Sequence, residues 1–498
     1  MLTIADAAKR AEDAAKPADA GVHNTDRYKW LALATVGIGT FMAPLDGSVV
    51  NIALPHIASA LRAGLTTVEW VVMMYLLVIS TLLLTYGRLG DMIGHKPVYL
   101  AGFVIFTIGS LLCGLSPTIG YLIAFRAVQA IGAGMMMAIG PAIVTSAFPA
   151  HERGKALGIN AMVVATALAL GPTIGGLLVG AFGWRSIFFI NLPIGVFGTL
   201  WALRVLHMNP VNPGQTFDVH GAVTIFVALT ALLLALSKGQ DLGWSSPQTA
   251  GLFGTAAVFG LLFLVNERRS AQPMMDLSLF RNKMFSAANV SALLNFMAQS
   301  AVTFLMPFYL ENVRHLEAAR AGMVISSMPL VVLVVAPFSG SLSDKIGSRL
   351  LSSTGMAIIT IALALLGGLG AATPLALISA ALAVAGLGAG LFQSPNNSAI
   401  MGSVPKHRLG IASGMLASMR NIGMVVGVAL SGALLTSRLP VHTARLSAQG
   451  LTGDLLRKQA FVLSLHDAYI AAATLAGIGI LTSLFRGKFV PAQKGEKP

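Results

Sequence analysis

One acid and one base lie inside long apolar stretches of this chain. Asp46 follows FMAPL and precedes GSVVNIALP, and Arg126 lies within LIAFRAVQAIGAG. A charge at bilayer depth costs roughly 2.5–3.5 kcal/mol on insertion scales, so such residues usually face a cavity and have a function. Removal from water disfavours a charged carboxylate, which suits Asp46 to carrying a proton. The alternative is a structural carboxylate capped by neighbours such as Ser48 or Asn51.

Arg126 is the natural partner of Asp46. A guanidinium cannot lose its proton, so it must be solvated or paired. A fixed cation favours the charged form of a nearby carboxyl, so a movement that changes the separation of the two groups would load or release a proton. The alternative is an arginine that bonds backbone carbonyls in a structural role. Gln129, one turn further on, could line the same cavity.

Polar residues in other apolar stretches could extend this cavity. Arg420 is a second cation within such a stretch, and it could contact a ligand or a group of backbone carbonyls. The candidate cavity residues are Asn51, Gln129, Asn295, Gln299 and Arg420. The titratable residues near the ends of the stretches, expected at a membrane interface, are His56, Glu69, Glu311 and Asp467.

The composition defines the surroundings of these residues. The chain has 498 residues, of which 55% are hydrophobic and 10% charged, and its mean hydropathy is +0.77. Soluble domains carry about 25% charged residues, so this chain is expected to lie in lipid. Its apolar stretches of roughly 20 residues match the length of a spanning helix, and backbone in lipid must satisfy its own hydrogen bonds. The alternation of barrel strands is not seen, so an all-α integral membrane protein is expected.

Fourteen spanning helices are expected. Their ranges are 30–55, 68–88, 97–116, 119–147, 155–181, 185–206, 219–237, 249–266, 285–311, 321–343, 350–370, 373–402, 409–436 and 466–485. An even number places both termini on one side. Lys and Arg concentrate on that side, which the positive-inside rule assigns to the cytoplasm. The formal charge of +14 is therefore attributed to topology rather than to nucleic-acid binding.

Two ten-residue stretches repeat one pattern. Residues 87–96 read GRLGDMIGHK and residues 340–349 read GSLSDKIGSR, each as a short charged hinge between two spans. Glycine allows a tight turn, and an aspartate can cap a helix or pair with cations of the opposite half and latch one state. The alternative is a loop that only directs folding and topology. The predicted gating residues are Gly87, Arg88, Asp91, Gly94, Lys96, Gly340, Asp344, Gly347 and Arg349.

The repetition extends over both halves of the chain. PAHERGKALG (149–158) matches PKHRLGIASG (405–414), and duplicated bundles are typical of transporters. Two pseudo-symmetric six-helix bundles with two inserted helices are therefore expected. The segments are a cytosolic tail (1–28), the N-terminal bundle (29–206), the inserted helices with a cytosolic linker (207–284), the C-terminal bundle (285–486) and a second cytosolic tail (487–498). Residues 437–465 are expected as an outer loop with a surface helix, or alternatively a partner-docking site.

Small residues recur at helical spacing in spans 5 and 13. Ala167, Gly171 and Gly175 lie at i, i+4 and i+8 and share one helix face, and such faces let helices approach closely in lipid. Pro172 removes a backbone donor and adds a kink. These faces are expected to form the seam between the halves, although ordinary packing gives the same spacing. The predicted seam residues are Gly171, Pro172, Gly175, Gly176, Gly423 and Gly427.

These motifs together resemble the major facilitator superfamily, and within it the fourteen-span drug:proton antiporter branch. The motifs are LDGSVVNIALP (45–55), GRLGDMIGHK (87–96), LIAFRAVQAIGAG (122–134), ALALGPTIGG (167–176) and WRSIFFINLPIG (184–195). The resemblance covers nearly the whole chain after residue 26. Departures from the usual residues of the branch are Ser48, Met92, Ala130 and Ala167. The resemblance implies a proton-relay role for Arg126.

Three functions are compatible with this sequence. The first is a proton-coupled antiporter that exports amphiphilic cationic or neutral small molecules by alternating access. The second is an exporter or importer of one metabolite, since fold does not fix function. The third is a membrane sensor or partner subunit, in which Asp46 would have no role.

An enzyme is not expected, because no catalytic triad, metal motif or phosphate-binding G-x-x-x-x-G-K-[ST] loop stands out. Cys113 is the single cysteine, which excludes an internal disulfide and a cysteine metal site. The expected energy source is a proton gradient, without a cofactor. The expected location is the inner membrane, with lipid, protons and a small molecule as partners and no nucleic acid, while a periplasmic adaptor is left open.

Overall fold

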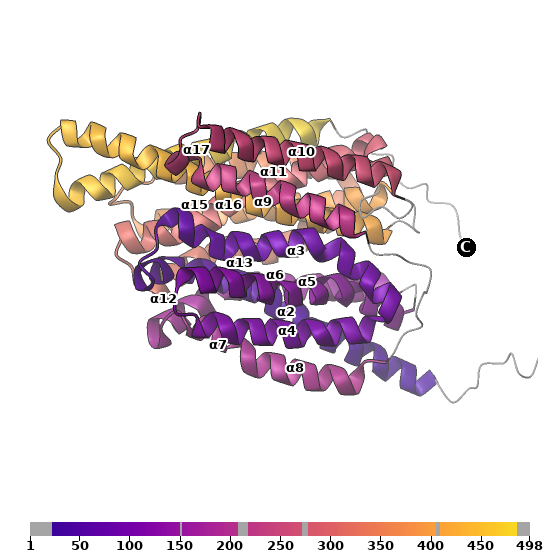
Figure 1. The fold of residues 1–498 in the computed structure, drawn as a ribbon. Coiled ribbons are helices and arrows are strands. Elements are labelled where there is room, and N and C mark those ends of the chain that lie inside the picture. Colours follow the sequence, from indigo (N-terminus) through magenta and orange to yellow (C-terminus); the bar gives the residue numbers. More distant parts are fainter. Residues whose placement is uncertain (1–21, 150–151, 208–217, 271–276, 405–408, 486–498) are drawn as a thin grey trace, which may run out of the picture.

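The computed structural model describes residues 22–149, 152–207, 218–270, 277–404 and 409–485, and every regular element in these ranges is helical (Figure 1). Within them, 14 helices are long and apolar enough to cross a membrane. The all-α class and the number of spans predicted from the sequence are therefore confirmed.

The first half consists of six spans that run back and forth along one direction. They are α2 (Val22–Ala60), α3 (Leu65–Ile93), α4 (His95–Leu115), α5 (Ile119–Ala147), α6 (Arg153–Phe182) and the pair α7 (Ser186–Phe189) and α8 (Asn191–Val205). The inserted helices follow as α9 (Val219–Leu242) and α10 (Pro247–Arg269).

The second half begins with a 3-10 turn and repeats the arrangement. Its elements are η1 (Leu277–Arg281), α11 (Lys283–Phe308), the π-helical turn η2 (Tyr309–Val313), α12 (Ala318–Ile325), α13 (Ser327–Ile346), α14 (Ser348–Gly367), α15 (Leu375–Gly402), α16 (Leu409–Ala448) and α17 (Gly453–Leu484).

Equivalent helices pack in the same pairs in the two halves. α2 packs on α6, and α3 and α4 both pack on α5; correspondingly, α11 packs on α16, and α13 and α14 both pack on α15. A duplicated chain gives this double pairing, which supports two pseudo-symmetric bundles. The inserted α9 packs on α10, on α3 of the first half and on α16 of the second.

The two ends of the bundle differ. α16 and α17 extend beyond the other helices at one end, on the left of Figure 1, which we call the hairpin end. The opposite end, where α2 begins and α17 ends, is the terminal end. Residues 437–465, expected as a loop, are therefore the last turns of α16, a connection at 449–452 and the first turns of α17. Paired extensions of two spanning helices replace the expected loop.

The two repeated stretches are almost wholly helical, which corrects the expected hinge loops. Residues 87–93 are the last turns of α3 and α4 begins at His95, so Gly94 alone separates the two helices. Its φ of 96° is matched by a φ of 88° at Gly347, between α13 and α14. Each of these glycines donates its N–H at 2.8 Å to a carbonyl four residues earlier. Side chains are strained at such φ values, so the turn requires glycine.

Candidate functional site

Asp46 and Arg126 form an ion pair inside the first half. Asp46 lies on α2 and Arg126 on α5, and Oδ2 of the aspartate is 2.5 Å from Nη1 of the arginine. Both side chains are fully buried, and α2 and α5 pack against each other. The structure thus brings together the two charged residues that were predicted to act on each other.

Two amides complete the surroundings of Asp46. Gln129 donates through Nε2 to Oδ1 of Asp46 at 2.9 Å and accepts from Nη1 of Arg126 at 2.8 Å. Asn191, the first residue of α8, donates to the same Oδ1 at 2.9 Å. Both amides also donate to the hydroxyl of Ser110 on α4, at 3.1 and 2.9 Å. Helices α2, α4, α5 and α8 therefore share one buried polar network.

α3 holds Arg126 from the other side. Nε donates to the carbonyl of Val71 at 3.0 Å, and Cζ lies 4.0 Å from the centroid of the Tyr75 ring. A desolvated cation over an aromatic face gains about 2 kcal/mol. Nη2 has no hydrogen-bond partner within the described part of the chain, so one of the three guanidinium nitrogens donates no hydrogen bond in this arrangement.

Close approach of α4 to α5 makes the network possible. A Cβ added at Gly109 would lie 2.6 Å from the backbone N and Cα of Gln129. A residue with any side chain would therefore push α4 away. Glycine at 109 lets the next residue, Ser110, reach both amides.

The hydrogen bonds of the network fit a negatively charged Asp46. A carboxylate only accepts hydrogen bonds, and here its two oxygens receive three, one of them charge-assisted. An added proton would remove the charge that holds Arg126. The position of Arg126 therefore depends on the negative charge of Asp46.

One face of α6 packs on α2 directly beside Asp46. A Cβ added at Gly175 would lie 3.1 Å from Val49, and one added at Gly171 would collide with Ser48. Ser48 and Val49 follow Asp46 closely in the chain. The position of α2 at the ion pair therefore depends on α6.

The adjoining face of α6 packs on α12 of the second half. Gly322 lies against the carbonyl of Pro172, and Gly176 lies against the carbonyl of Ala318, too close for side chains. Both contacts are toward the hairpin end, where the halves are closed on each other. Of the seam residues predicted in span 5, Pro172 and Gly176 lie between the halves, and Gly171 and Gly175 lie within the first.

The seam residues predicted in span 13 pack within their own half. Gly423 lies against Leu293 and Gly427 against Met297, both on α11. They are the counterpart of the α6 glycines that face α2, because α11 and α16 pair as α2 and α6 do. This corrects the expectation that Gly423 and Gly427 lie between the halves.

The cavity residues predicted in the second half include an amide chain and an isolated cation. On α11, Asn295 is buried and accepts from Gln299, whose own oxygen accepts from Gln393 of α15 at 3.5 Å. Arg420 on α16 is partly buried, and it makes no ion pair with any residue that the structure describes. These side chains can offer hydrogen bonds to a solute.

Asn51 and Gln129, the two residues predicted to line a cavity in the first half, do not line the cavity that the structure shows there. Gln129 belongs to the Asp46 network, and Asn51 is partly buried with its side-chain oxygen unpartnered among the described residues. A cavity of about 580 Å³ lies toward the terminal end between α2, α6 and α8. Its lining, which includes Trp30 and Phe41, contains none of the five predicted residues.

The predicted gating residues lie at the terminal end. Nζ of Lys96 donates to the carbonyl of Leu203 at 2.9 Å, where the dipole of α8 favours a cation. Gly340 packs on Ser394 of α15, and Arg349 is exposed. The side chains of Arg88, Asp91 and Asp344 lie outside the described residues, so their pairing between the halves stays a prediction.

Sequence reasoning missed three residues around the ion pair. Asn191 lies in WRSIFFINLPIG, where a polar residue at the start of an apolar span was an available signal. Ser110 and Tyr75 are ordinary residues of apolar spans and give no signal. Glu69 lies near the end of its span, and the packing of the helices leaves it no exposed surface, which the sequence did not indicate.

Two equivalent bundles of spanning helices, closed on each other at one end and holding a buried ion pair, are the architecture of a secondary transporter. The chain belongs to the Major Facilitator Superfamily, whose family model matches residues 36–428. It is therefore a multi-pass membrane transporter and not an enzyme.

Similar proteins carry names with different substrates. The chain is 37% identical to the riboflavin transporter RibZ of Clostridioides difficile, over 92% of this chain and 98% of that protein. It is 35% identical to the multidrug resistance protein Stp of Mycobacterium tuberculosis, over 83% and 77% respectively. A solved bacterial homolog of the human lysosomal transporter Spinster matches with a TM-score of 0.67 at 14% identity, over 92% of this chain and 97% of that one. This last likeness shows the fold alone.

Proposed function

We propose that this transporter is a proton-coupled antiporter that exports amphiphilic cationic or neutral small molecules. The observation that carries the proposal is the buried ion pair of Asp46 and Arg126, which share the side-chain amide of Gln129. Protonation of Asp46 would release Arg126 and loosen α2 from α5. The name of Stp, a multidrug resistance protein at 35% identity, supports the substrate class.

The proposed cycle moves protons inward and substrate outward. We assign the terminal end to the cytoplasm of a cell with this protein in its inner membrane, because most Lys and Arg of the connecting segments lie at that end. With the hairpin end closed, Asp46 would release its proton to the inside. Asp91 and Asp344 would latch the terminal end while the hairpin end is open.

Efflux from vesicles driven by an imposed pH gradient tests this proposal. The purified protein should export a fluorescent lipophilic cation, and Asp46→Asn should reduce gradient-driven export to the protein-free background. Asp241→Asn, which neutralises an exposed carboxylate on α9, is the matched control and should export normally. Normal gradient-driven export by Asp46→Asn would contradict the mechanism.

Transport of a single metabolite is the second candidate, and Arg420 favours it. A partly buried cation with no ion pair among the described residues repels cationic solutes and suits an anion or a hydrogen-bond acceptor. The similarity to a riboflavin transporter over nearly the whole chain agrees with such a solute. Transport of riboflavin but of no lipophilic cation, with loss of that transport in Arg420→Gln, would favour this candidate over the first.

A further inference from the structure

Glu69 is a buried acid outside the Asp46 network. It lies near the start of α3, toward the hairpin end, and has no exposed surface. Its Oε1 contacts the hydroxyl of Ser237 on the inserted helix α9. Its Oε2 has no hydrogen-bond partner in the described part of the chain, and no cation there forms an ion pair with Glu69. A buried carboxyl group without a cation needs a physical explanation.

Glu69 occupies the junction of three parts of the molecule. α3 of the first half packs there on the inserted α9 and on α16 of the second half. Gly432 of α16 lies against Oε2, so that a Cβ at this position would collide with the carboxyl group. If the halves part at the hairpin end, Glu69 loses the cover that α16 provides.

The hydroxyl of Ser237 indicates which form of Glu69 fits the closed junction. Its oxygen accepts from the indole N–H of Trp70 at 3.1 Å, lies 3.2 Å from the carbonyl of Thr66, and contacts Glu69. A hydroxyl has one proton to donate, so with an ionised Glu69 it can donate either to the carboxylate or to the carbonyl of Thr66, which also accepts within α3. A neutral Glu69 can donate to the hydroxyl of Ser237, which then donates to the carbonyl of Thr66. All three contacts of this hydroxyl are then hydrogen bonds. An ionised carboxylate with one bare buried oxygen would be costly.

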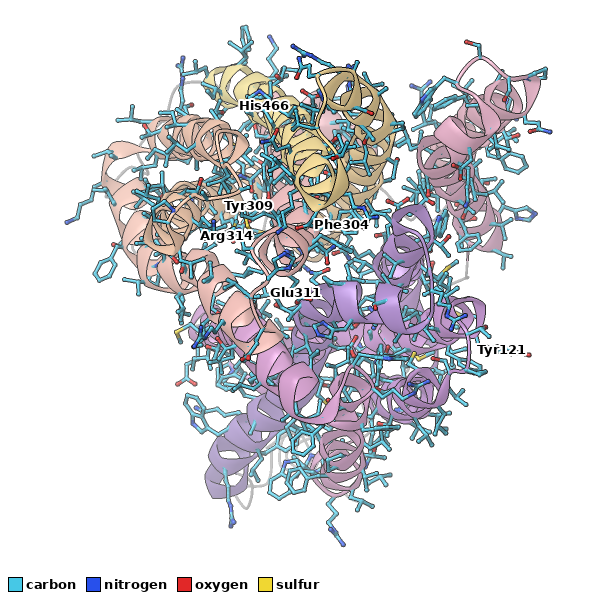
Figure 2. The ribbon with its side chains drawn as sticks, turned by 90° about the vertical axis from the view of Figure 1, so that its left-hand side faces the viewer. Tyr121, Phe304, Tyr309, Glu311, Arg314 and His466 are labelled. Atoms are coloured by element: carbon cyan, nitrogen blue, oxygen red, sulfur yellow. The ribbon has the colours of Figure 1, made fainter. Side chains whose placement is uncertain are left out.

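The charged groups on the helices around α3 form no ion pair with Glu69 among the described residues. They include Lys238 on α9, which follows Ser237 and lies 3.7 Å from Asp241; Arg438 and His442 on α16, 3.6 and 2.9 Å from Asp467; Arg126 on α5, paired with Asp46; His56 on α2, 3.0 Å from Glu311; and His95 and Lys96 of α4, at the terminal end. The pair of His56 and Glu311 also joins the halves at the hairpin end, where Figure 2 shows Glu311 among helices of both. An experiment must therefore distinguish the effect of pH on this pair from the effect of pH on Glu69.

We propose that Glu69 is a second proton-binding site, which takes up a proton from the side where the hairpin end opens and must be neutral before α3 closes on α16. This rests on the proposed function only in that the halves part at the hairpin end during transport. It requires neither a particular substrate nor coupling at Asp46. Closure of the hairpin end then depends on the pH of the compartment that it faces.

Spin-label distances across the hairpin end test this site. Labels at Ser59→Cys on α2 and Val441→Cys on α16, both exposed positions, in a Cys113→Ala background, report the separation of the halves. Measurements in proteoliposomes from about pH 5 to pH 9, without substrate or gradient, should show short distances at low pH and a growing long-distance population at high pH. Glu69→Gln, neutral at every pH, should keep the short distances throughout.

Two further variants make the assignment specific. Asp454→Asn, which neutralises an exposed acid on α17, should follow the parent, and Glu69→Asp, which still titrates, should keep the pH dependence with a displaced midpoint. Parent-like pH dependence in Glu69→Gln would overturn the proposal and point to His56 and Glu311, and so would a parent that does not respond to pH. If Glu69→Gln does not fold, the proposal would be overturned by a Glu69→Asp variant whose distances change at the same midpoint pH as those of the parent. Failure of gradient-driven efflux would instead affect the proposed function alone, since no transport is measured here.

Discussion

The carboxylate of Asp46 and the guanidinium of Arg126 lie 2.5 Å apart, fully buried, on two helices of the same half. The ion pair therefore does not bridge the two halves. One packed route to the second half runs through α6, which contacts α2 with one face and α12 with the next, and another runs through α3, which holds Arg126 and packs on α16. A change of charge at Asp46 can thus reach the other half as a shift of packed helices.

Removing Arg126 should destabilise the protein more than removing both partners. Arg126→Gln leaves a buried carboxylate without its cation, which costs about 3–5 kcal/mol. The double variant Asp46→Asn/Arg126→Gln leaves no unpaired charge and should recover much of the loss. Thermal unfolding in detergent measures both. Equal losses in the single and double variants would show that the ion pair is not what stabilises this region.

A second carboxylate beside Asp46 should abolish proton-driven export. Asn191 donates to Asp46 at 2.9 Å, so Asn191→Asp replaces a donor with a like charge, which is unfavourable at such a distance. Gradient-driven efflux should fall to background. Asn312→Asp makes the same change at an exposed position near the hairpin end and should export normally. Similar export by the two variants would argue against a role for Asn191.

A side chain at Gly176 should hold the hairpin end open. Any Cβ there meets the backbone of Ala318, whereas one at Gly180, a turn further along α6, meets nothing within 4 Å. Gly176→Val and Gly180→Val carry the same helix penalty, so their difference reports the contact between the halves. Thiol labelling of Ser326→Cys, a position buried between the halves beside Thr173, should be faster in the first variant, measured in a Cys113→Ala background. Equal labelling rates would mean that this crossing does not control closure.

The two turn glycines should resist replacement. Gly94→Ala and Gly347→Ala place a side chain at positive φ and should each destabilise the protein by about 1–2 kcal/mol. Gly87 lies in the helical part of the same motif with open space around it, so Gly87→Ala should be neutral or stabilising by about 0.5–1 kcal/mol. Thermal unfolding compares the three. A loss at Gly87 as large as at Gly94 would contradict this account of the motif.

The ion pair and the turn glycines show how far sequence reasoning reaches. Asp46 and Arg126 are conspicuous because charges are rare within apolar spans. The repeated stretches were recognised by their glycines, but their extent was wrong, because a charged stretch can continue a helix until one glycine at positive φ ends it. Gly423 and Gly427 were assigned to the wrong contact, since spacing reveals a small helix face but not the helix that packs on it.

Length and hydropathy establish the helices, their number and their duplication, because a helix in lipid satisfies its own backbone and depends only on its own residues. Which polar groups meet is a different matter. The donors to Asp46 come from helices that are distant in the chain, and the burial of Glu69 depends on Ser237 and Gly432, which approach it only after the halves and the inserted pair have packed together. Such contacts are properties of the assembled bundle, so the tertiary structure alone decides them.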